Sequence, residues 1–242
     1  MGPVQAPLLH RPSPGRRGVM RWTWRRSLEG VDLDRVFAGV PRVGVVDGCT
    51  YCYAQSDLDL LGGDPALVPD DLVGAFAREV TDHWAEEQYW LVWRGLAPRI
   101  LALLEASPDA VMLRGLSFAR FSTWPSKEQA ALREALSAML TRAVSGDQTP
   151  YIVDVLVCAA AHVDHDLTPW LNLLDTLTDA DAGIARLARF WAEDLAQGGK
   201  PMLWWFPEDP AAPLRDWLYS DALHERLSRM DDRDTLIAIA RM

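Results

Sequence analysis

Apolar side chains recur at steps of three and four residues through residues 88–105, so one face of this segment carries a broad apolar stripe. Such spacing is typical of an amphipathic helix that must pack against several neighbours. Pro98 lacks the N–H that would bond the carbonyl of Arg94, and a bend is expected there. The segment is therefore predicted to be a central helix of the fold. Its stripe consists of Tyr89, Trp93, Leu96, Ile100, Leu103 and Leu104.

Helical spacing continues on both sides of this segment, and cap signals divide the chain into roughly ten helices joined mostly by short turns. Residues 151–163 are apolar almost all round, which fits either a buried helix or a buried strand, and their alanines and helical neighbours favour the helix. The prediction is an all-α fold, either an irregular bundle or a short helical solenoid, without a repeated sequence. The expected helices span about 27–40, 57–61, 70–84, 88–105, 108–121, 126–144, 151–163, 169–177, 184–195, 214–230 and 233–241.

Composition divides the chain into two parts. Residues 1–26 are rich in Pro, Gly and Arg and show no helical period, so we expect a disordered basic arm, or a gene start placed too early before Met20. Residues 27–242 are expected to form a single helical domain. A boundary at residues 146–150 would leave two small halves with exposed apolar helices.

Charge is distributed unevenly between these two parts. The net charge is -10, but the arm holds six Arg and no acidic residue, so the other 18 basic side chains face all 34 acidic ones. This acidic body would repel nucleic acid, which only the arm could hold, and it would repel anionic lipid. No apolar run is long enough to span a membrane. Three Cys without a secretory framework favour a reducing compartment, so a cytoplasmic location is expected.

Three short phrases together resemble a family of bacterial helical proteins without an assigned activity. They are the Cys-Thr-Tyr-Cys pair in residues 48–52, the Leu-Ala-Pro-Arg-Ile-Leu helix in 96–104 and the Trp-Pro-Ser-Lys-Glu helix start in 124–132. Ala97 is a departure, because the family has Leu directly before Pro. The resemblance covers about residues 33–177 and implies an all-helical fold.

Cys49 and Cys52 form the sharpest local motif. Thiolates at this spacing bind Zn²⁺ well, but a structural zinc site needs four ligands and the chain has no second pair. His83 and Cys158 are candidates that folding could bring to the same place. The alternatives are thiols that merely pack in the loop, or a redox dithiol.

His162, His165 and Asp166 follow the predicted helix 151–163. Imidazoles and carboxylates together can hold a divalent metal that activates water for hydrolysis. The His-Asp doublet resembles the core of the helical HD phosphohydrolases, although that resemblance covers two residues only. The alternative is structural, with Asp164 or Asp166 capping the helix that begins near Pro169.

Trp204, Trp205 and Phe206 lie in a loop bounded by Gly and Pro, where a packed helix cannot cover all three rings. Aromatic side chains on a loop are typical interface anchors, although the rings could also fold back to seal the C-terminal helices. Arg99 beside Pro98 is a candidate for anion binding if it faces an open cleft. If it is buried, a carboxylate partner is expected from Glu79, Glu128 or Asp154.

These features favour a non-enzymatic helical protein-interaction module, an adaptor, regulator or neutralising partner of another protein. It would use the acidic surface and the aromatic loop, because no complete catalytic set is present. The alternative is a metal-dependent enzyme, hydrolase-like, that uses Cys49 and Cys52 or residues 162–166.

Overall fold

The computed structural model describes residues 31–79 and 83–242, and within these residues it has eleven α-helices, ten of them of seven residues or more, and no strand. The prediction of an all-α fold is confirmed. In chain order the α-helices are α1 (Leu33–Phe37), α2 (Gln55–Gly62), α3 (Asp70–Arg78), α4 (Glu86–Ala106), α5 (Ser126–Ser145), α6 (Pro150–Ala161), α7 (Thr168–Thr176), α8 (Asp181–Ala196), α9 (Ala212–Leu218), α10 (Asp221–Arg229) and α11 (Arg233–Ala240). The short 3₁₀ helices that lie wholly within the described residues are η1 (Pro65–Leu67), η3 (Arg114–Leu116) and η4 (Phe121–Thr123).

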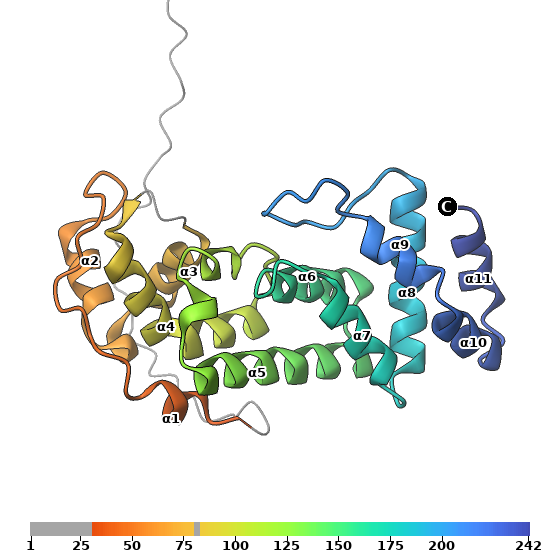
Figure 1. Cartoon of the computed structure of the whole chain (residues 1–242), viewed down its shortest axis with the longest axis horizontal. Coiled ribbons are helices and arrows are strands. Elements are labelled where there is room, and N and C mark those ends of the chain that lie inside the picture. Colours follow the sequence, from red (N-terminus) through yellow and green to blue (C-terminus); the bar gives the residue numbers. More distant parts are fainter. Residues whose placement is uncertain (1–30, 80–82) are drawn as a thin grey trace, which may run out of the picture.

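Helix α5 links the two ends of the elongated molecule. It runs along the long axis in Figure 1 and contacts α1, α4, α6, α7 and α8. Helix α4, the predicted central helix, continues through Pro98 and packs against α1, α3 and α5. All the buried apolar side chains of the described residues except Ala211 belong to one continuous cluster that extends from Val31 to Ile239. The core is therefore shared by the described helices from α1 to α11.

Residues 108–121 do not form the predicted helix. They form turns with η3 in their middle and lead into η4, and Arg120 has a left-handed backbone with φ of 53°. The segment lies directly against α4, where a Cβ on Gly115 would come within 2.4 Å of the Tyr89 hydroxyl and 2.7 Å of the Trp93 indole nitrogen. Packing against α4 thus outweighed the helix-start signal at Pro108.

The ends of the chain also differ from expectation. The predicted helix 214–230 is two helices, α9 and α10, because the Ser220 side chain accepts a hydrogen bond from the Leu223 N–H and caps a new helix. Helix α1 begins after Asp32, which caps it through the Arg35 N–H. The predicted arm, residues 1–26, and the expected start of the first helix at Ser27 lie outside the described residues.

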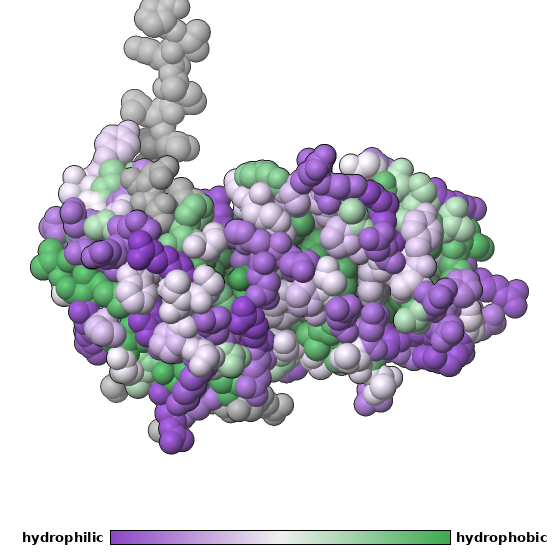
Figure 2. All heavy atoms as spheres, viewed as in Figure 1, coloured by the Kyte–Doolittle hydropathy of each residue, from purple (hydrophilic) through white to green (hydrophobic). Residues whose placement is uncertain are grey.

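The surface shown in Figure 2 is mostly hydrophilic, with apolar areas scattered among the polar ones. None of the described helices has the length and hydropathy required to cross a lipid bilayer.

Candidate metal centre

The loop that carries Cys49 and Cys52 is held against the segment that leads into α4. The Cys49 N–H donates to the carbonyl of His83 at 2.8 Å, and the Ala85 N–H donates to the carbonyl of Asp47 at 3.1 Å. Gly48 and Trp84, between these two bonds, form an isolated antiparallel bridge. Two segments more than 30 residues apart in sequence are therefore paired at this point.

Side chains reinforce the pairing. The Asp47 N–H donates to Oε1 of Gln88, in the first turn of α4, at 2.6 Å. A Cβ on Gly48 would lie 2.7 Å from Leu58 and 2.9 Å from the Trp84 ring, so the loop approaches this closely only with Gly at that position. The ring of Tyr53 also packs against Trp84, with the two ring centroids 4.7 Å apart. The contacts fix the loop, and the cysteines with it.

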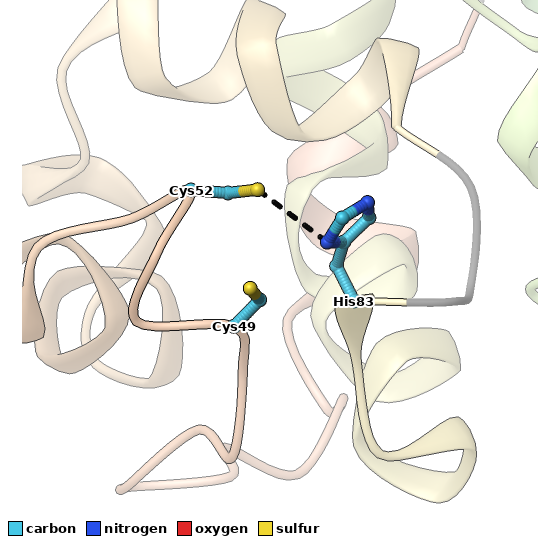
Figure 3. Close-up of side chains that lie close together, drawn as sticks. All are labelled: Cys49, Cys52 and His83. Carbon is cyan, nitrogen blue, oxygen red and sulfur yellow. Dashed lines mark hydrogen bonds between the residues drawn. The ribbon is translucent and has the colours of Figure 1, made fainter.

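This pairing brings Cys49, Cys52 and His83 together. One possible ligand atom from each of them lies within 4.8 Å of the other two. The Cys52 Sγ is 3.4 Å from Nδ1 of His83. Figure 3 shows both sulfurs and the imidazole facing the same space from the two paired segments. Cys49 and His83 are half-buried and Cys52 is exposed, so the cluster is open to solvent on one side.

The two thiols differ in acidity. Hydrogen bonding by His83, followed by the backbone N–H groups of Cys52 and Tyr51, lowers the pKa of Cys49 to about 7. Partial desolvation raises the pKa of Cys52, and the neighbouring Cys49 and the charge of Glu79 raise it further. Near neutral pH Cys49 is thus partly a thiolate, the form of cysteine that binds metals and reacts.

The geometry suits a zinc ion. Bonds of about 2.0–2.3 Å around a tetrahedral Zn²⁺ hold its ligand atoms roughly 3.5–3.8 Å apart, so small side-chain rotations would close the three atoms onto the metal. Two thiolates and one imidazole are ligands that Zn²⁺ prefers, and the described residues thus supply three of the four ligands of a tetrahedral site.

Tyr53 and Trp84, which directly follow Cys52 and His83 in the sequence, each carry a buried polar atom. The hydroxyl of Tyr53 and the indole N–H of Trp84 have no hydrogen-bond partner among the described residues. Buried polar atoms normally have a hydrogen-bond partner, so these two groups are exceptions within the core.

Cys158, the other candidate ligand, lies elsewhere. Its side chain is buried in α6 and its Sγ is 3.8 Å from a carboxylate oxygen of Asp154. Burial raises the pKa of this thiol, which disfavours the thiolate.

The structure places the aromatic loop, residues 204–206, beside His162 and His165. The sequence analysis had considered this loop and the two histidines as two unrelated candidate sites. Trp205 packs between the two imidazoles, stacked on His165 with centroids 5.1 Å apart and edge-on to His162 at 5.2 Å. Nδ1 of His162 donates to the Cys158 carbonyl at 2.7 Å, and its Nε2 accepts from the Trp204 N–H at 3.2 Å. Both ring nitrogens of His162 are thus engaged, and neither is available to a metal in this arrangement.

The acidic residues near His165 have structural partners. Asp166 accepts a hydrogen bond from the Thr168 N–H at 2.8 Å, at the start of α7, and Asp164 pairs with Arg133 at 2.6 Å. Asp166 therefore bonds the first residue of α7 without occupying the N-cap position, which belongs to Leu167 and has no side-chain cap bond, and Asp164 forms an ion pair with α5 and does not cap α7. Among the described residues, Cys49, Cys52 and His83 form the single group of possible metal ligands that converges.

Arg99 does not face an open cleft. Its guanidinium donates to the carbonyls of Pro65, at 2.7 Å, and Val68, and to the carboxylate of Asp70. None of the three expected partners pairs with it. Glu128 instead pairs with Arg94, in a buried bidentate contact of 2.7 and 2.8 Å that the sequence analysis missed. Arg99 therefore joins α4 to η1 and α3.

Comparison with known protein families, with curated proteins and with solved structures found no match for the chain. The resemblance of residues 33–177 to a family of bacterial helical proteins stays a prediction.

Proposed function

We propose that this chain is a zinc-binding helical protein in which Cys49, Cys52 and His83 hold one Zn²⁺ and leave an open fourth coordination position, one that no other described residue fills. The observation that carries the proposal is the convergence of three ligand atoms within 4.8 Å. They come from two segments that backbone hydrogen bonds already hold together. A partly pre-formed site of this kind needs little reorganisation on binding a metal.

The open position favours a chemical role over a purely structural one. Structural zinc sites are closed by four protein ligands, whereas catalytic sites have three and a water molecule. Zn²⁺ lowers the pKa of such a water to about 7, so hydrolysis is the reaction class that the centre supports best. Cys52 is exposed, which gives a substrate access to the centre from solvent.

Metal analysis of the purified protein tests this proposal. We expect about one zinc per chain after reconstitution and removal of loosely bound metal. The variants Cys49→Ser, Cys52→Ser and His83→Ala should each lose most of it, because two ligands hold Zn²⁺ much more weakly than three. Matched controls are Cys158→Ala, which removes the third cysteine, and His165→Ala, which removes an imidazole of the alternative site; both should retain the metal.

Either of two results would contradict the proposal. One is failure to bind zinc at all, and the other is full zinc content in Cys49→Ser and His83→Ala that fold as judged by circular dichroism. Substitution with Co²⁺ examines the open position separately. Addition of azide should change the visible spectrum if an exogenous ligand enters the coordination sphere, and leave it unchanged if the site is closed.

A second candidate function, binding of another protein, is favoured by the exposure of the aromatic loop. Trp204 and Phe206 are 42% and 75% exposed, and Met202 between Pro201 and Leu203 is 57% exposed. The loop is held in place, because the Trp204 N–H bonds His162 and the Arg114 guanidinium lies 4.7 Å from the centre of the Trp204 ring. Fixed apolar side chains in solvent are characteristic of interaction sites.

Affinity purification of wild-type protein and of the Met202→Ser, Phe206→Ser double variant tests this candidate. Both side chains point to solvent, so the fold should survive, while a partner that uses the loop should be lost. Tyr151→Ser, an exposed aromatic residue of α6 at 61% exposure, is the control. If the double variant and Tyr151→Ser recover the same amount of a partner, the loop is not the binding site of that partner.

A further inference from the structure

We infer that oxidation of Cys49 and Cys52 to a disulfide releases the metal, which makes the centre a redox switch that controls zinc binding. The inference rests on the zinc centre proposed above and adds its regulation. It follows from the position of the two sulfurs, their exposure and the isolation of the third thiol.

The two cysteines are placed to form a disulfide without a change of fold. The Cys52 N–H donates to the carbonyl of Cys49 at 3.1 Å, which closes a turn between them. The ends of such a turn have Cα atoms less than about 7 Å apart, a separation that disulfides span. Their sulfurs already belong to the group of atoms within 4.8 Å of one another.

Access and selectivity also favour this pair. Cys52 is exposed and Cys49 is half-buried, so a small oxidant reaches them from solvent. Cys158 is 1% exposed and packed in α6, so it competes neither for the oxidant nor as a disulfide partner. Of the three disulfides that the three cysteines could form, oxidation therefore yields only the one between Cys49 and Cys52.

The oxidant we consider is hydrogen peroxide. The Cys49 sulfur attacks one peroxide oxygen, the O–O bond breaks, and the departing hydroxide takes a proton to become water. The Cys52 sulfur then attacks the sulfenic acid of Cys49; the S–S bond forms, the S–O bond breaks, and the second hydroxide leaves as water after taking a proton. The sulfurs lose two electrons and the peroxide gains them.

Oxidation removes two of the three protein ligands at once. His83 alone cannot hold the ion, because structural and catalytic zinc sites use at least three protein ligands. The loop itself stays attached, since the bonds from the Cys49 N–H to His83 and from the Asp47 N–H to Gln88 involve no sulfur. Reduction therefore restores the original ligand set in place.

The test uses full-length Cys158→Ala protein loaded with Zn²⁺ and a chromophoric zinc chelator. Addition of hydrogen peroxide should release one zinc for each disulfide formed. Mass spectrometry of the peptide containing both cysteines should show a loss of about 2 Da, the two hydrogens removed. Dithiothreitol followed by Zn²⁺ should restore the bound metal. The metal-free protein should form the same disulfide, which separates oxidation from metal loss.

Three results would overturn the inference. Zinc that stays bound while peroxide is consumed, or release that accompanies oxygen addition to sulfur without a disulfide, would exclude the switch and leave the zinc centre standing. Failure of the reduced protein to bind zinc would overturn both proposals. Metal-free Cys52→Ser protein is the matched control for the mass measurement alone, because Cys49 can still gain oxygen there but no disulfide, and no loss of about 2 Da, can form.

Discussion

At the scale of single residues, His162 couples the aromatic loop to pH. It is 2% exposed, and burial is the main cause that lowers its pKa to about 4. In the unfolded chain this histidine takes up a proton near pH 6.5, whereas in the native protein it stays neutral until about pH 4. Its contribution to the free energy of unfolding is therefore fully present above about pH 6.5 and is lost as the pH falls toward 4. Between these two pH values the free energy of unfolding falls by about 3 kcal/mol because of this one residue.

Urea unfolding at about pH 7 and about pH 5 measures this effect. It is done with a chelator present, so that the metal centre does not contribute. We expect His162→Gln to be less stable than wild type near neutral pH and to lose less stability on acidification, because glutamine does not titrate. Equal pH dependence of the two proteins would contradict this assignment.

The buried ion pair of Arg94 and Glu128 should affect the free energy of unfolding more than His162 does. Each side chain is 10% exposed, and the two form a bidentate contact between α4 and α5. Glu128→Ala should lower the free energy of unfolding by about 3–5 kcal/mol, because it leaves a buried guanidinium unpaired. In the control pair Arg142 and Glu105, with side chains 37% and 43% exposed, Glu105→Ala should cost less than about 1 kcal/mol.

Urea unfolding of both variants and of the Arg94→Met, Glu128→Leu double variant checks this prediction. The double variant should recover most of the lost stability, since no charge remains buried. A double variant no more stable than Glu128→Ala would show that the loss comes from packing and not from the unpaired charge.

At the scale of elements, Gly183 sets the separation of α8 and α5. A Cβ at this position would lie 1.8 Å from the carbonyl oxygen of Val144, near the end of α5. Gly→Ala inside a helix normally stabilises it by about 1 kcal/mol. In Gly183→Ala the clash with Val144 should outweigh this gain and lower the free energy of unfolding by about 1–3 kcal/mol.

Thermal unfolding of Gly183→Ala measures the change. Gly95→Ala, inside α4, is the matched control, because the nearest atom to a Cβ there is a side-chain carbon of Pro65 at 3.7 Å, an ordinary van der Waals contact. A melting temperature of Gly183→Ala at or above wild type would mean that α8 can move away from α5 at no cost.

At the scale of the whole molecule, the continuous core predicts a single unfolding transition. Helix α5 contacts α1 and α4 as well as α6, α7 and α8, so neither end of the molecule keeps its packing when the other unfolds. Tryptophan fluorescence and far-ultraviolet circular dichroism should report the same midpoint in urea. Two midpoints separated beyond experimental error would indicate two units that unfold independently.

The sequence by itself determined the secondary structure of most elements. Apolar spacing located α4, α5 and α8, and the long apolar run of residues 151–163 was correctly assigned to a helix, α6. These helices were predictable because their periodicity is local and agrees with their burial. The segment 108–121 was not, because its conformation depends on the close approach of Gly115 to α4. Contacts across the core, which no local signal encodes, decided its backbone.

The candidate site depended on tertiary structure to a greater degree. The pair Cys49 and Cys52 was visible in the sequence, but three dimensions were needed to select His83 over Cys158 as its companion. The pairing of the loop with residues 83–85 made that choice, through two backbone hydrogen bonds and the contact of Gly48 with Trp84. Likewise, Arg99 found its partners in α3 and η1 and not among the expected carboxylates. Local sequence encodes which atoms can bind, whereas packing between distant segments decides which of them meet.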